Sequence, residues 1–284
     1  MTAEGNPQAT EKNAEQPAKE PDFLYEKRGH VALCTFNRPQ KKNALTIEMI
    51  VRMADAWHEA DNDPDVRAIV LTGKGDTFFA GSDLKSMSKG KWDAAPEYLQ
   101  RLKDDPDLHW RALLRHYKTK KPLIAAVEGG ALAGGTEVLQ GTDIRVGAAS
   151  SVYAVSEVNW GLFPLGGSSV RLRRQIPYAI AAEMLLAGRK LNATEALQWG
   201  LINHVVPDGK ALEKAMEIAQ TIAHKCGPLA VAALKRSLIE TEGLPETDAL
   251  KISLQIGQPI FKTRDAREGP RAFIEKRPPN FTGE

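Results

Sequence analysis

The sequence has few of the residues that would form a disulfide framework, a metal site or a membrane span. Its 284 residues include two cysteines, Cys34 and Cys226, which are not spaced as a CxxC motif. The six histidines show no HExxH or other compact ligand spacing, so no metal site is expected. No apolar run reaches membrane-spanning length. Two isolated cysteines favour a reduced, intracellular protein.

Neither sign of charge is in large excess. Lys and Arg number 38 against 36 Asp and Glu, which gives a net charge of +2. This balance does not predict nucleic-acid binding, although a mild positive excess suits a small anionic ligand. Residues 1–21 are polar and lack large apolar side chains, so we expect a disordered tail. That tail also lacks the features of a signal peptide or a mitochondrial presequence, and we therefore expect a cytoplasmic protein.

Hydrophobic patterns predict strands that alternate with helices. Alternating residues on both sides of Gly29 predict a hairpin, and apolar runs at 66–73, 121–130 and 143–148 predict buried strands. Thr46 is the expected N-cap of a helix whose apolar face includes Trp57. Helices are also expected over 210–225 and 227–242. This order predicts an α/β core followed by a C-terminal α-helical region.

Two glycine turns follow predicted strands, in FFAGSDL (78–84) and ALAGGTEV (131–138). The second turn does not fit a dinucleotide fingerprint, and Gly135 stands where a P-loop needs lysine. The sequence has no GxSxG nucleophile elbow. A backbone oxyanion site is the remaining functional interpretation, because N–H groups at a helix start lack partners. We expect Gly134 and Ala80 to supply its two donors. Tightly packed structural turns are the alternative.

Two glutamates lie in short apolar settings near these turns. Glu137 is one helical turn beyond Gly134, and Glu157 follows twenty residues later. If the two carboxylates share one dry pocket, one of them should hold a proton near neutral pH. Such a pair suits the addition or removal of water next to a carbonyl. Spacing alone does not bring the two together, and a surface position or a helix N-terminal charge remains the alternative for each.

The sequence resembles the enoyl-CoA hydratase/isomerase (crotonase) superfamily from about residue 22 to the C-terminus. The resemblance is carried, in order, by FNRPQKKNAL, FFAGSDLKSM, PLIAAVEGGALAGGTEVLQGTDIRVGA, SEVNWGLFPLGGSSVRL and FIEKRPPNF. It implies a crotonase-type ββα spiral core over 22–195. It also implies a helical region over 196–284 that serves in trimerisation and covers the CoA pocket. A homotrimer or a dimer of trimers is therefore expected.

The resemblance also implies roles for individual residues. Ala80 and Gly134 match the oxyanion donors that bind the thioester oxygen of an acyl-CoA. Glu137 matches the glutamate that activates water for attack at Cβ, and Glu157 matches the one that exchanges the Cα proton. The residues expected to border the thioester are Gly81, Ser82, Asp83 and Leu165, and the basic groups considered for the CoA phosphates are Lys41, Lys42, Lys276 and Arg277. No cofactor is expected, because coenzyme A is part of the substrate.

Several positions depart from the family pattern. Ala133 replaces the first of three usual glycines, and Ser156 stands where a proline is common. Leu165 replaces a glycine that helps position the water, so its side chain is expected to crowd or redirect that water. The segment 88–110 is the part of the chain that is most particular to this sequence. Its apolar residues either line the acyl pocket or pack the loop down; they are Trp92, Tyr98, Leu99 and Leu102.

An enoyl-CoA hydratase that acts on a trans-2-enoyl-CoA is the leading functional hypothesis. A Δ3,Δ2-enoyl-CoA isomerase, which generally needs only the acid at Glu157, and another acyl-CoA dehydratase are the alternatives. A non-catalytic member that binds acyl-CoA or RNA is less favoured. Both glutamates are present, and the sequence has no strong basic stripe. We expect no nucleic-acid or membrane partner.

Overall fold

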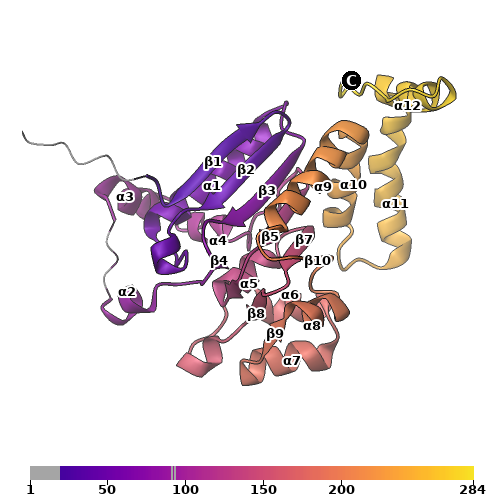
Figure 1. Ribbon diagram of the computed structural model, residues 1–284. Helices are drawn as coiled ribbons and strands as arrows, with labels where there is room; N and C mark the ends of the chain where they lie inside the picture. The colour runs from indigo at the N-terminus through magenta and orange to yellow at the C-terminus, as the bar shows by residue number, and fades with distance from the viewer. Residues whose placement is uncertain (1–19, 91, 93) are drawn as a thin grey trace, which may run out of the picture.

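The computed structural model describes residues 20–90, 92 and 94–284, which form two β-sheets surrounded by helices (Figure 1). The larger sheet has the order β1-β2-β3-β5-β7-β10 and the smaller one β4-β6-β8-β9. The strands of the larger sheet are β1 Phe23–Arg28, β2 Val31–Phe36, β3 Ala68–Gly73, β5 Leu123–Val127, β7 Ile144–Ala148 and β10 His204–Val206. Those of the smaller sheet are β4 Thr77–Phe79, β6 Gly130–Leu132, β8 Val152–Ala154 and β9 Lys190–Asn192.

Helices cover both sheets and form most of the chain after residue 206. The α-helices are α1 Ile47–Asn62, α2 Leu84–Ser88, α3 Pro96–Asp104, α4 Leu108–Ala112, α5 Gly134–Leu139, α6 Ser168–Gln175, α7 Tyr178–Ala187, α8 Ala193–Gln198, α9 Ala211–Lys225, α10 Pro228–Glu240, α11 Glu246–Gly257 and α12 Arg264–Ile274. The 3₁₀-helices are η1 Pro39–Lys41, η2 Glu157–Trp160 and η3 Gln258–Lys262. In the described part of the chain, no helix is long and apolar enough to span a bilayer.

The chain passes three times from the larger sheet to the smaller one, through β3 and β4, β5 and β6, and β7 and β8. Pairing along this path is parallel in both sheets. Successive strand pairs therefore build a spiral, with helices inserted between its turns. The predicted α/β class is confirmed, as are the hairpin around Gly29 and the three predicted buried strands.

Two apolar clusters hold the layers together. One includes α1, where Thr46 Oγ1 accepts a hydrogen bond from Met49 N–H at 3.1 Å, so the predicted N-cap is confirmed. Trp57 of this helix is buried and donates its Nε1–H to the Ala112 carbonyl at 2.9 Å. The other cluster forms between the larger sheet and α9. Both faces of the sheet are thus covered, as expected for parallel strands.

Ordered contacts begin before residue 22. The predicted tail reached residue 21, and its residues 1–19 lie outside the described part of the chain. Asn37 Nδ2 donates to the Pro21 carbonyl at 2.8 Å and to a Glu20 carboxylate oxygen at 3.2 Å. Asp22 is buried. Glu20 and Pro21 therefore belong to the folded part, which corrects the end of the predicted tail.

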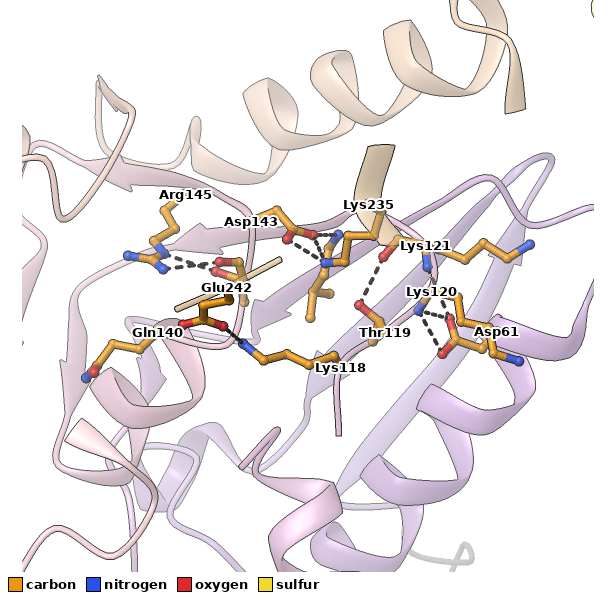
Figure 2. Close-up of polar contacts among 12 residues, drawn as sticks. Asp61, Lys118, Thr119, Lys120, Lys121, Gln140, Asp143, Arg145, Lys235 and Glu242 are labelled. Atoms are coloured by element: carbon orange, nitrogen blue, oxygen red, sulfur yellow. Dashed lines mark hydrogen bonds and ion pairs between the residues drawn. The ribbon is translucent and has the colours of Figure 1, made fainter. Parts of the chain in front are cut away.

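An ion pair between a buried lysine and a partly exposed aspartate joins the C-terminal helices to the sheet (Figure 2). Lys235 of α10 pairs with Asp143, which immediately precedes β7, and Asp143 also accepts the Leu123 N–H at 2.7 Å. Lys118 Nζ lies 3.9 Å from a Glu242 carboxylate oxygen just beyond α10. Farther along, α11 and α12 extend away from the two sheets (Figure 1).

Candidate active site

Three parallel strands of the smaller sheet end at the segments that the sequence analysis singled out. β4 is followed by residues 80–83, β6 by the start of α5, and β8 by η2. Because these strands are neighbours and run in one direction, their carboxyl ends share one edge of the sheet. The fold thus brings Gly81, Gly134, Glu137 and Glu157 to one place.

Glu137 is the more buried of the two glutamates, with 4% of its surface exposed. Its two carboxylate oxygens accept the N–H of Gly166 at 2.9 Å and of Ser168 at 3.1 Å. Burial raises the pKa of Glu137, and these backbone donors oppose that rise because they favour the ionised form. A Cβ at position 166 would lie 2.6 Å from Glu137 Oε2, so the close contact requires glycine.

Glu157 begins η2 and has a different environment. Its Oε2 is buried and accepts no hydrogen bond from any described residue. Burial, and secondly the charge of Glu137, raise the pKa of Glu157 to about 7. The two carboxylates thus differ in their surroundings: Glu137 accepts two backbone N–H groups, whereas a buried oxygen of Glu157 accepts none from the described residues. This difference favours ionised Glu137 and protonated Glu157.

A pair of backbone N–H groups lies at the same edge of the sheet. Gly81, at φ +80°, approaches the start of α5 so closely that a Cβ on it would lie 2.8 Å from Gly134 N. Within the described part of the chain, neither the Gly134 nor the Ser82 N–H donates a hydrogen bond. Ala133 has φ +50°, an unfavourable conformation for alanine that costs about 1–3 kcal/mol. Strain of this kind is common at functional sites.

Ala80 does not fit the donor role predicted for it. Its N–H donates to the Lys42 carbonyl at 3.1 Å, so this group is already occupied. Two residues later, the Ser82 N–H has no acceptor among the described residues. The local sequence does not show which N–H groups of this turn are occupied, because this depends on the pairing of residues 42–45 with residues 80–82.

Two further predicted substrate-binding residues have structural contacts of their own. Asp83 caps α2 by accepting the N–H groups of Lys85 and Ser86, and it pairs with Arg38 at 3.3 Å. Leu165 is 55% exposed, and its carbonyl accepts Arg115 Nη1 at 2.5 Å. The backbone groups that contact Glu137 come instead from Gly166 and Ser168, which the sequence analysis missed. The two glycines before α6, Gly166 and Gly167, were the sequence feature that could have indicated these contacts.

The segment that borders the predicted acyl pocket packs partly against the protein core. Tyr98 and Leu102 of α3 contact the larger apolar cluster, and Tyr98 OH accepts Arg52 Nη2 at 3.0 Å. These contacts favour the packing interpretation for both residues. Two of the basic groups considered for the CoA phosphates are engaged in ion pairs, Lys42 with Asp76 and Arg277 with Glu268. Across residues 20–90, 92 and 94–284, no group of three metal-ligating side chains is found.

A family model described as enoyl-CoA hydratase/isomerase matches residues 26–284. The chain belongs to this family. Enoyl-CoA hydratase EchA19 of Mycobacterium tuberculosis is 53% identical over 264 residues, which cover 92% of this chain and 96% of that protein. Carnitinyl-CoA dehydratase of Salmonella typhi is 35% identical, with 90% and 97% covered. A solved enoyl-CoA hydratase of Mycobacterium tuberculosis has a TM-score of 0.83 at 38% identity, with 93% and 100% covered. The predicted crotonase superfamily and fold are thus confirmed.

Proposed function

We propose that this family member is an enoyl-CoA hydratase, which adds water across the double bond of a trans-2-enoyl-CoA thioester. The observation that carries the proposal is the contrast between two adjoining carboxylates. Glu137 accepts two backbone N–H bonds, which favour a base. Glu157 has a pKa of about 7 and a buried oxygen without a donor among the described residues, which favours an acid.

In the proposed reaction, Glu137 takes a proton from water as the water oxygen bonds to Cβ. The electron pair of the double bond moves toward the thioester carbonyl and leaves an enolate. Glu157 then donates its proton to Cα, and the carbonyl re-forms. The net change is one water added, with one proton gained by Glu137 and one lost by Glu157. No electrons are transferred to or from an external group, so the reaction calls for no cofactor beyond the coenzyme A of the substrate.

The N–H groups of Gly134 and Ser82 are our proposed oxyanion donors. Both belong to the turns at the carboxyl ends of parallel strands, and both are free of other acceptors in the described residues. Each such donor contributes roughly 3–4 kcal/mol to stabilising the transition state. Gly81 permits the close approach of the two turns, and Asp83 fixes the start of the following helix. Ser82 replaces Ala80 in this proposal.

A dehydratase would use the same groups in the opposite direction, and carnitinyl-CoA dehydratase is among the relatives. An isomerase would need only the acid at Glu157, whereas here two backbone donors and Gly166 are arranged around Glu137. That arrangement favours water chemistry over isomerisation. We also propose that the chain assembles with further copies of itself, as a homotrimer or a dimer of trimers.

The test is hydration of crotonyl-CoA and longer enoyl-CoA substrates by wild type, Glu137→Gln and Glu157→Gln. We expect wild type to hydrate at least one chain length and both variants to lose at least about a hundredfold in kcat. Glu97→Gln is the matched control, since Glu97 is an exposed glutamate at the start of α3. It should retain wild-type activity.

Isomerisation of a 3-enoyl-CoA separates the alternatives. If wild type only isomerises, and Glu137→Gln still does so, the enzyme is an isomerase and the hydratase proposal is wrong. If wild type neither hydrates, dehydrates nor isomerises but binds acyl-CoA, a non-catalytic member is the better description.

A further inference from the structure

The loop between η2 and α6 holds the Glu137 carboxylate, yet it has no helix or strand of its own over residues 162–167. Gly166 and Ser168, which donate to Glu137, lie in this loop and at the start of α6. The distance between base and substrate therefore depends on what holds the loop in place. A shift of about 1 Å in a catalytic group is enough to reduce the rate a hundredfold.

Two arginines join this part of the chain to the turn after α4. One belongs to that turn and donates to the loop, and the other belongs to α6 and donates to the turn. Arg115, just after α4, donates from Nη1 to the Leu165 carbonyl at 2.5 Å. Arg171 of α6 donates from Nη2 to the carbonyls of Leu114 at 2.6 Å and Arg115 at 3.0 Å. Each segment thus contributes one guanidinium and at least one carbonyl. We call these three hydrogen bonds the arginine clamp.

The carbonyls that Arg171 binds belong to an unusual turn. Leu114 is fully buried and has φ +57°, a conformation that is strained for a bulky residue. Its side chain packs against Gly141 at the end of α5, where a Cβ would lie 2.7 Å from Leu114 Cβ. The turn is therefore fixed from two sides, by the helix that carries Glu137 and by Arg171. Positions of this kind persist only where the surroundings impose them.

Arg171 also places a positive charge near the base. Its side chain lies against Gly167, where a Cβ would be 3.7–3.9 Å from the Arg171 Cδ, Nε and Cζ. Gly167 stands between the two donors to Glu137. The charges that face Arg171 are Glu137 and Glu242, which attract it, and Arg115 and Lys118, which repel it. Arg171 Nη1 is buried and has no hydrogen-bond partner in the described part of the chain.

We propose that Arg171 is a positioning residue for Glu137. It anchors α6, whose Ser168 N–H binds that carboxylate, to the turn from which Arg115 holds the loop. Its charge attracts Glu137 and so favours the ionised form of the base. The catalytic part of this inference rests on the proposed hydratase function, but the electrostatic part concerns the free protein. The two can therefore be tested separately.

The primary test is a titration of the Glu137 carboxyl by NMR in protein labelled with ¹³C-glutamate, with the signal assigned by Glu137→Gln. Arg171→Met should raise the pKa of Glu137, since it removes a positive charge that attracts this carboxylate. Arg174→Met is the matched control, because Arg174 lies on the same helix but faces Glu242 at 3.5 Å. That variant should titrate as wild type does. Equal titration curves for all three proteins would overturn the electrostatic part of the proposal.

The second test separates charge from position. Arg171→Lys keeps the charge but cannot bridge two carbonyls as a guanidinium does. The pKa of Glu137 should rise less in this variant than in Arg171→Met, because the charge is kept, while kcat for hydration falls at least about tenfold across the pH range. Wild-type kcat in this variant would show that the arginine clamp does not position the base. Because the NMR titration needs no turnover, an enzyme without hydratase activity would refute the proposed function and leave the titration result decisive for Arg171. If Arg171→Met does not fold, Arg171→Gln takes its place in the same titration.

Discussion

The two glutamates of the site have the same side chain but different immediate neighbours. Glu137 receives two backbone N–H groups, whereas a buried oxygen of Glu157 receives none from the described residues. Burial raises the pKa of both, and the charge of Glu137 raises that of Glu157 further. The difference in hydrogen bonding therefore favours the ionised form of Glu137 and the protonated form of Glu157.

This arrangement predicts a bell-shaped dependence of kcat/KM on pH for hydration. Activity requires Glu137 ionised and Glu157 protonated, so it falls as pH drops through the raised pKa of Glu137. It also falls as pH rises through the pKa of Glu157, about 7. Steady-state rates with an enoyl-CoA substrate, measured across the stable pH range, check both limbs. The exposed-site variant Glu97→Gln should give the same curve as wild type. A rate that does not change from about pH 6 to about pH 9 would contradict the assignment of acid and base.

For single residues, the sequence indicates candidate acidic side chains of the site better than it indicates which backbone N–H groups act as donors. Glu137 and Glu157 stand out because carboxylates are rare in apolar segments. The Ala80 N–H, which the sequence suggested as a donor, binds the Lys42 carbonyl instead, because the direction of an N–H is set by strand pairing that the local sequence does not encode. Gly166 and Ser168 were missed for a related reason. They contact Glu137 from about thirty residues away, through a loop whose path depends on Arg115 and Arg171.

Among the elements, α9 shows how a helix covers a parallel sheet closely. Its fully buried residues are alanines at every fourth position: Ala211, Ala215, Ala219 and Ala223. The apolar period correctly predicted a helix over 210–225, and the larger apolar residues Leu212, Ile218 and Ile222 are only partly buried beside the alanine row. Large side chains dominate a hydrophobic pattern, whereas small ones allow the closest approach.

The alanine row predicts that larger side chains are not tolerated on α9. Ala219→Leu should lower the free energy of unfolding by about 1–3 kcal/mol, because the added atoms force α9 away from the sheet. The matched control is Glu217→Leu, on the exposed face of the same helix, which should change stability by no more than about 0.5 kcal/mol. Urea unfolding followed by circular dichroism gives both values. Equal stability of Ala219→Leu and wild type would show that α9 does not pack tightly on the sheet.

For the molecule as a whole, the strand order could not be read from local patterns. The hydrophobic runs predicted β3, β5 and β7 but not that each is followed by a three-residue strand in a second sheet. Strands this short carry too little alternation to be recognised. The spiral was expected only because of the family resemblance, and the passage of the chain between the two sheets explains how distant segments form one site.

The C-terminal helices leave much of their apolar surface uncovered. Lys235 is the only buried residue of α10, and Ile256 is the only one of α11. Large apolar side chains are exposed along α10–α12 at Leu234, Leu238, Leu250, Leu254, Phe261, Phe273 and Ile274. Helices of this length depend on packing of an apolar face for their stability. An exposed apolar surface that continues over several elements marks an interface with another molecule.

We therefore predict that α10–α12 form the contact between copies of the chain. Light scattering after size exclusion should give wild type a mass of three or six times the 31.1 kDa of one chain. Leu250 and Leu254 lie one turn apart on α11 and are 61% and 62% exposed, so Leu250→Glu with Leu254→Glu places two charges in the interface. The double variant should run as a monomer. The free energy needed to desolvate two unpaired carboxylates exceeds the stabilisation that the remaining apolar contacts provide. Glu240→Gln, an exposed change at the end of α10, should leave the wild-type mass unchanged. A wild-type mass of 31.1 kDa would refute the assembly and leave the exposed apolar face of these helices to another partner.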